Sequence, residues 1–285
     1  MKLLNSNQKE IERSKILTKS AKLWAIKNWH YLTKVDTPLI NVNSSSKIAK
    51  GKKINLLTGI LYLKPADMIS TKTLCAGADA FGCKKECLES SGQLGMRAGD
   101  NAKIKRTILF LLRERDFLEH MRAEILAHQK SAERKKQKFA VRLNGTSDID
   151  FSNFIESMPS TQFYDYSKIY HRVKNNTLKN YDLTFSGSAN NPSVLKITAR
   201  AIRAGFRTVL AMNTAETKSE YKLPNKLGLI PLVNMDDTDA RFLDDLNAVG
   251  VLARKGSNKD QRAKDEKTNN FFFTQSTINQ LGELL

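Results

Sequence analysis

The sequence predicts an α/β protein built on a partial or complete parallel (β/α) barrel, with a basic helical extension before it. Short apolar runs of β type alternate with helix-type segments at intervals of about thirty residues, which is typical of βαβ units. Residues 1–60 carry 12 Lys and Arg against 3 Asp and Glu. We therefore expect a basic N-terminal extension and linker over residues 1–53 and a barrel-like domain over residues 54–285.

The extension is expected to contain one amphipathic helix over Asn7–His30, because apolar residues recur there at near-helical spacing. A strand or hairpin is expected over Ile54–Leu63, broken by Gly59. Two helices should follow, over Asp100–Arg115 and Asp116–Lys136. The second carries an apolar stripe formed by Phe117, Met121 and Ile125.

Further β-type runs are expected in the rest of the chain, at Phe139–Leu143, Gln162–Asp165, Asp182–Phe185, Arg207–Met212, Gly228–Val233 and Gly250–Ala253. Between two of them, Asn191 followed by Pro192 predicts a helix start and Gly205 its end. Asp237 predicts a second helix over Ala240–Ala248. A last apolar run, Phe271–Thr274, follows a charged segment.

Membrane and secretory classes are excluded by the hydropathy pattern. The longest purely apolar run, Ile108–Leu112, is far shorter than the roughly 18 residues of a membrane span. The first residues are too polar for a secretory signal. We therefore expect a cytoplasmic protein with no membrane partner, and nothing in the sequence indicates its oligomeric state.

The cysteines are the strongest chemical signal. Cys75, Cys83 and Cys87 are the only three in the chain and lie within thirteen residues, an odd number that argues against a disulfide framework. Three thiolates from one glycine-containing loop suit a [4Fe–4S] cluster whose fourth iron stays open. A closed zinc site would need a fourth ligand, and no histidine lies between Tyr31 and Glu119. Burial of the three as structural residues is the remaining alternative.

Polar residues follow several predicted strands. In parallel α/β folds, ligands bind at the carboxyl ends of the strands. Asn144, Ser147, Asp148 and Ser186 are therefore expected to face a cofactor or ligand, whereas Asn191 and Asp237 are expected to be helix caps. The pattern indicates no catalytic residue and leaves open whether the chain is an enzyme.

The three-cysteine loop after a first strand is similar to that of the radical S-adenosylmethionine superfamily. That resemblance implies a cluster whose open iron binds S-adenosylmethionine. This sequence has cysteine gaps of seven and three, instead of three and two, and Glu86 stands where an aromatic residue precedes the last cysteine. Asn144-Gly145-Thr146 lacks the paired glycines and the acid of the cofactor motif. These departures affect cofactor cleavage more than cluster binding.

The chain more closely resembles the bacteriophage family called gene product 88, over about Ile54–Ala253. The segments that carry this resemblance are Cys75–Cys87, Val141–Asp148, Phe163–Lys168 and Phe185–Ser188. The resemblance implies a viral protein that acts in the host cytoplasm.

Two alternatives to the iron–sulfur prediction stay open. A formal charge of +18 and a pI of about 9.8 favour a nucleic-acid-binding protein, with Asn7–His30 and Arg134–Lys138 as candidate patches. In that case the cysteines bind zinc or are structural. A zinc-dependent hydrolase or deaminase, with Glu86 as its nearest acid, is a third interpretation.

Overall fold

The computed structural model describes most of the chain, namely residues 8–34, 38–42, 54–84, 86–87, 96–213, 226–244, 246–254 and 271–285. Contacts divide the chain into two compact units, unit 1 (Met1–Ala76 and Gly92–Phe163) and unit 2 (Gly77–Ser91 and Tyr164–Leu285). The boundary expected at residue 53 falls among residues outside the described ranges and stays a prediction.

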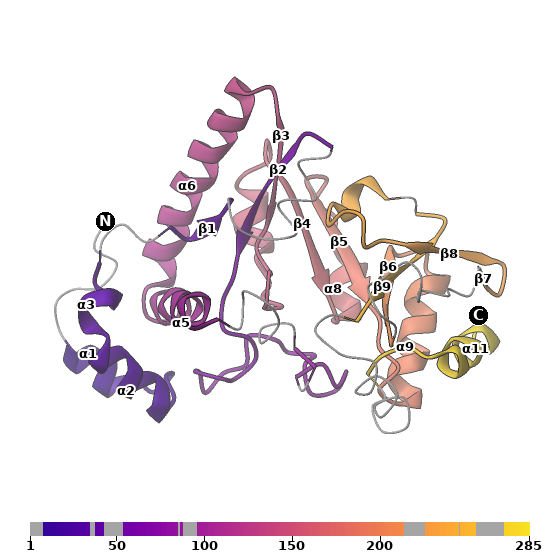
Figure 1. Cartoon of the computed structure of the whole chain (residues 1–285), viewed down its shortest axis with the longest axis horizontal. Coiled ribbons are helices and arrows are strands. Elements are labelled where there is room, and N and C mark those ends of the chain that lie inside the picture. The colour runs from indigo at the N-terminus through magenta and orange to yellow at the C-terminus, as the bar shows by residue number, and fades with distance from the viewer. Residues whose placement is uncertain are drawn as a thin grey trace. The chain divides into compact units, whose positions relative to one another are not determined.

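Nine strands of the described residues form one sheet in the order β1-β2-β3-β4-β5-β6-β9-β8-β7 (Figure 1). Their bounds are β1 Ile40–Asn41, β2 Leu56–Leu61, β3 Lys138–Arg142, β4 Gln162–Ser167, β5 Tyr181–Ser186, β6 Thr208–Met212, β7 Lys226–Leu227, β8 Ile230–Asn234 and β9 Val249–Ala253. The pairs β2·β3, β3·β4, β5·β6, β6·β9 and β8·β9 are parallel. The predicted α/β class with a largely parallel sheet is confirmed.

The sheet is open and not closed. It begins at β1 and ends at β7, two-residue strands that each pair antiparallel with a single neighbour. The described strands therefore do not form the complete barrel expected as one alternative. Gly59 also does not break β2, because it lies within the strand, where a Cβ atom would approach Ile40 Cγ2 to 2.7 Å.

The helices of the described residues alternate one for one with the strands only from β3 to β6. They are α1 Gln8–Arg13, α2 Lys19–Lys27, α3 Trp29–Leu32, α5 Arg97–Leu112, α6 Glu114–Arg134, α7 Ser152–Glu156, α8 Tyr170–Lys174, α9 Pro192–Arg203 and α11 Gln275–Glu283, with a 3-10 turn, η3, at Arg241–Leu243. None of them is long and apolar enough to cross a bilayer.

In unit 1, α6 packs on β1, β2 and β3. Its predicted stripe of Phe117, Met121 and Ile125 is fully buried, which confirms that prediction. The break between α5 and α6 lies at Arg113, close to the expected position.

The N-terminal segment is three short helices and not the single helix expected over Asn7–His30, of which Asn7 lies outside the described residues. The chain leaves helical geometry between α1 and α2, where Leu17 forms an antiparallel bridge with Ser70. Thr18 then caps α2 by accepting a hydrogen bond from the Ala21 amide. This pairing between residues distant in sequence outweighs the helical spacing of the apolar residues.

Lys105 of α5 joins the N-terminal helices to the rest of unit 1. Its side chain is fully buried, its Nζ donates to the carbonyls of Tyr31 and Lys34, and it lies 4.8 Å from the centre of the Tyr31 ring. Burial lowers the pKa of Lys105 from 10.5 to about 8, and the charges of Lys34 and Arg106 contribute.

This lowered pKa predicts a pH dependence of stability. Below pH 8 Lys105 is protonated in both states and the folded protein bears the full cost of the buried charge, whereas between pH 8 and 10.5 only the unfolded chain stays protonated. The free energy of unfolding, relative to that of Lys105→Met, should therefore rise across this window by at most about 3 kcal/mol. Urea unfolding at several pH values measures the difference. An exposed control, Lys130→Met, should give a flat difference, and a flat Lys105 curve would contradict the prediction.

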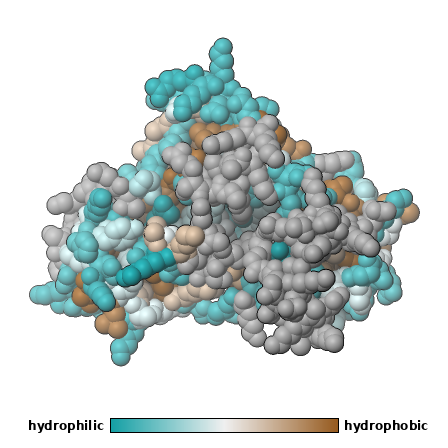
Figure 2. Space-filling model, viewed as in Figure 1, coloured by the Kyte–Doolittle hydropathy of each residue, from teal (hydrophilic) through white to brown (hydrophobic). Residues whose placement is uncertain are grey.

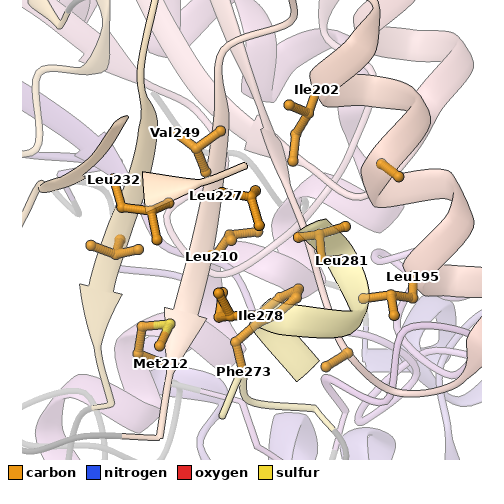
Figure 3. Packing of buried hydrophobic residues seen from close by; sticks show 13 residues of the cluster. Leu195, Ile202, Leu210, Met212, Leu227, Leu232, Val249, Phe273, Ile278 and Leu281 are labelled. Carbon is orange, nitrogen blue, oxygen red and sulfur yellow. The ribbon is translucent and has the colours of Figure 1, made fainter. Parts of the chain in front are cut away.

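In unit 2, β6, β8 and β9 pack against α9 and α11 around one apolar cluster (Figure 3). Its members are Ala189, Leu195, Ala199, Ile202, Leu210, Met212, Leu227, Leu232, Val249, Val251, Phe273, Ile278 and Leu281. Asn191 caps α9 by accepting from the Val194 amide at 3.0 Å, and Gly205 follows the helix with a φ of 73°, as the sequence predicts.

The prediction of a helix over Ala240–Ala248 is wrong. Only η3 forms there, and Asp237 accepts no capping bond in this described part of the connection. Arg241 turns inward, where its Nη2 donates to the Thr238 carbonyl and its Nη1 lies 3.0 Å from Asp244 Oδ2. An inward arginine with partners on both sides holds this segment in a tight turn.

Candidate functional site

Cys75 lies at the carboxyl end of β3 in unit 1. It forms a parallel bridge with Asp148, whose amide donates to the carbonyl of Leu74 at 2.9 Å. The half-buried thiol accepts a hydrogen bond from the Ala66 amide at 3.3 Å. The start of the cysteine segment is therefore attached to the loop that follows β3.

The loop after β3 is held by its own polar side chains. Asn144 Oδ1 accepts from Ser147 Oγ at 2.9 Å and from the Ile149 amide at 2.8 Å, and both side chains are buried. Asn144 Nδ2 donates to the Ile149 carbonyl at 3.0 Å. These bonds show that Asn144 and Ser147 shape the loop, while contact of Asn144, Ser147 and Asp148 with a cofactor stays a prediction.

Gly145 is required by the close approach of this loop to the end of β2. A Cβ atom there would lie 2.6 Å from the Leu61 carbonyl oxygen and 2.6 Å from Tyr62 Cδ1. The Gly145 amide donates to that same carbonyl at 3.0 Å. The Asn-Gly-Thr motif therefore has a packing role in unit 1 whatever it binds.

Unit 1 contains a buried charge cluster that the sequence analysis does not predict. Lys64 follows β2, and its Nζ lies 2.6 Å from Asp100 Oδ1 on α5. Lys103 Nζ lies 3.5 Å from the same oxygen, and both lysines are buried. Helical spacing of Asp100 and Lys103 could have indicated their pairing, but the approach of Lys64 could not be predicted.

The rest of the cysteine segment, Gly77–Cys87, belongs to unit 2 and is attached to the residues that follow β5. Ser188 Oγ donates to the Phe81 carbonyl at 2.8 Å, and Asn190 Nδ2 donates to the Ala80 carbonyl at 2.9 Å. Gly82 has a φ of 70°, and a Cβ atom there would lie 2.5 Å from Asn190 Oδ1. The positive φ favours glycine at this position, and a larger residue would also displace the Asn190 side chain.

Glu86, next to Cys87, is bound to the end of β9. Arg254 Nη2 lies 3.1 Å from Glu86 Oε2, and its Nη1 donates to Asn213 Oδ1 at 3.2 Å. The guanidinium is buried and stacks over the Phe272 ring at 4.3 Å. An ion pair that is partly shielded from water in this way fixes the loop more firmly than a fully exposed pair would.

Lys168 follows β4 and lies between two aromatic rings of unit 2. Its Nζ is 5.5 Å from the centre of the Phe81 ring and 4.9 Å from that of Phe271. It donates to Ser186 Oγ at 3.1 Å and to the Ser186 carbonyl at 3.2 Å. Ser186 thus faces a cation at the strand end, and its contact with a cofactor stays a prediction.

Lys168 and Arg254 are functional candidates that the sequence reasoning missed. Arg254 directly follows the expected β-type run that ends at Ala253, and Lys168 lies three residues after the run expected to end at Asp165, which is the signal that could have found them.

The thiols themselves are half-buried, and all three, which lie in the described ranges, are outside any disulfide. Cys75 belongs to unit 1, and Cys83 and Cys87 belong to unit 2. Over the ranges that the structure describes, no group of three or more His, Cys, Asp or Glu side chains is arranged to hold a metal ion. The donor chemistry suits a cluster, but the described arrangement does not gather three ligands.

Comparisons with known proteins give one relationship. No curated protein and no solved structure matches the chain. The model of the phage family described as Gene product 88 matches residues 14–270. This match covers the cysteine segment, the strand-end residues of both units and most of the helices. The chain therefore belongs to the Gene product 88 family.

Proposed function

We propose that this chain is an iron–sulfur protein in which Cys75, Cys83 and Cys87 bind a [4Fe–4S] cluster. The observation that carries the proposal is the placement of the thirteen-residue cysteine segment at strand carboxyl ends within each unit. Ligands bind at that edge of parallel sheets. A cluster held by three cysteines leaves one iron for a ligand that the protein does not supply.

The surroundings of the thiols support this proposal. In unit 2, the loop that carries Cys83 and Cys87 is fixed by three separate anchors, Ser188, Asn190 and Arg254. Lysines at the strand ends, such as Lys168, offset the negative charge that thiolates and sulfides bring.

A [4Fe–4S] cluster needs its three cysteine ligands close together, and the described residues do not gather three potential ligands. In this proposal the cysteine segment folds around the cluster as it binds. Metal sites of small loops form in this way, since binding energy is coupled to local folding.

A more specific form of the proposal adds two points, both taken from the radical S-adenosylmethionine superfamily. The open sheet is a partial barrel, and S-adenosylmethionine is the ligand of the open iron. The cysteine spacing and the Asn144-Gly145-Thr146 motif depart from that superfamily. Equilibrium binding of S-adenosylmethionine to the cluster-loaded protein tests this form separately. Cluster binding without cofactor binding would leave the first proposal standing and remove the second.

Removal of one thiol tests the cluster. Anaerobically purified protein from an iron-replete host should be brown, contain iron and acid-labile sulfide, and show broad visible absorption that bleaches with dithionite. Cys83→Ala should lose most of the iron, because a three-cysteine site cannot spare a ligand. Lys84→Gln, beside it in the same loop, should keep the iron and serves as the matched control.

Two outcomes would overturn the proposal. The first is native protein that holds neither iron nor sulfide. The second is stoichiometric zinc without sulfide, which would favour the zinc interpretation of the same cysteines. Equal iron in Cys83→Ala and in native protein would remove Cys83 from the ligand set.

A further inference from the structure

The C-terminal end of α6 and the turn into β3 carry a dense group of cations. Residues 129–138, called the α6 tip here, contain five basic residues and one acid, Glu133. The five are Lys130, Arg134, Lys135, Lys136 and Lys138, and all are exposed. Figure 2 shows hydrophilic residues gathered at the same end of α6.

The backbone of the α6 tip is fixed by hydrogen bonds within unit 1. The amides of Lys135 and Gln137 donate to the Ala132 carbonyl at 3.0 and 2.9 Å. Asn55 Nδ2 donates to the Lys136 carbonyl at 2.9 Å, and the Lys138 amide donates to the Asn55 carbonyl at 3.1 Å. The cations therefore project from a rigid turn, which lowers the entropy cost of binding a partner.

Folding does not require these charges. None of the five forms an ion pair with another residue of the described ranges, and Glu133 accepts instead from Gln129 Nε2 at 3.2 Å. Lys130 and Arg134 are one helical turn apart, where like charges destabilise a helix. The helix dipole favours cations only within the last turn. A surface that repels itself in this way is suited to an anionic partner.

We infer that the α6 tip binds the phosphate backbone of nucleic acid without reading its sequence. Lys130 and Arg134 lie about 6 Å apart along the helix and on the same side of it, so both cations can face one anionic surface. An anionic membrane is a poorer partner, because the large apolar side chains that the described residues expose near the cations, Leu126 on α6 and Ile54 beside Asn55, are isolated aliphatic ones and not aromatic. The inference is independent of the cluster, and its failure would leave the proposed function unaffected.

Charge removal at the α6 tip tests the inference. In Arg134→Gln/Lys135→Gln/Lys138→Gln, affinity for a random-sequence DNA duplex should fall roughly tenfold or more at moderate salt. The slope of log K against log salt should become shallower by about 2 to 3, because each lost phosphate contact removes about 0.9. Fluorescence anisotropy of the full-length protein between about 50 and 200 mM salt measures both quantities.

The matched control removes the same charge from exposed positions of unit 2, as Lys174→Gln/Lys179→Gln/Lys196→Gln. It should bind nearly as native protein does. Equal losses in the two triple variants, native-like binding by the tip variant, or no duplex binding by native protein would each overturn the inference. So would loss of binding to phosphatidylserine vesicles with unchanged duplex binding. Circular dichroism and the melting temperature should be unchanged, since the substituted side chains are exposed.

Discussion

Arg241→Met is expected to lower the free energy of unfolding by up to about 3 to 5 kcal/mol, because it leaves the half-buried carboxylate of Asp244 without the cation that it contacts. The Arg241 side chain is fully buried and lies 3.0 Å from Asp244. Arg207, also buried, lies 3.2 Å from Asp182 and donates to the Asp244 carbonyl. Two arginines and two aspartates thus share one water-poor region of unit 2.

The pH dependence of this loss follows from the carboxyl groups. Burial raises the pKa of Asp244, and Arg241 and Arg207 lower it in part. Burial likewise raises the pKa of Asp182 against the opposing effect of Arg207. A raised carboxyl pKa means that the folded state binds the proton more tightly than the unfolded state, so ionisation costs stability as the pH rises through it. Without Arg241 these pKa values rise further, and the loss should shrink as the pH falls.

Urea unfolding at neutral and acidic pH measures this effect. Arg200→Met on α9, whose guanidinium lies over the Tyr170 ring at 4.6 Å near the surface, is the control and should cost less than about 1 kcal/mol. Arg241→Met/Asp244→Asn should recover part of the loss, since it removes one unpaired charge. If Arg241→Met costs no more than Arg200→Met, the buried network does not stabilise unit 2.

Phe273→Ala is the second large effect, with an expected loss of about 3 to 5 kcal/mol for a fully buried ring. Phe273 is inserted beside β6, where its amide donates to the Ala211 carbonyl at 2.8 Å and its carbonyl accepts from the Asn213 amide at 2.9 Å. Its ring belongs to the cluster that also contains Leu210 and Ile278 (Figure 3). The cavity that the missing ring would leave cannot collapse easily, because both β6 and α11 contribute residues to the cluster around it.

The same substitution should loosen the strand-end residues of unit 2. Phe271 and Phe272, which contact Lys168 and Arg254, are held in place by the segment that Phe273 anchors. Hydrogen exchange at the Asn213 amide should accelerate together with the loss of stability. Phe271→Ala, at a half-buried position, should cost clearly less and is the control. Equal costs for the two variants would show that Phe273 does not anchor the segment.

Local patterns in the sequence were sufficient for much of the fold. The stripe of Phe117, Met121 and Ile125 predicts a buried helix face because helical periodicity depends only on neighbouring residues. The cap at Asn191 and the termination at Gly205 were predictable for the same reason. Family membership was also indicated by the sequence itself, since its motifs are contiguous.

Tertiary structure decided the rest. The helix expected over Asn7–His30 is interrupted because Leu17 pairs with Ser70, and the helix expected after Asp237 is displaced by the buried Arg241. The sheet stays open because β1 and β7 are short antiparallel edges, which strand count alone cannot reveal. The partners of Lys168 and Arg254 lie far from them in sequence. Contacts between distant residues depend on how helices and strands pack against one another. Local periodicity in the sequence does not determine that packing.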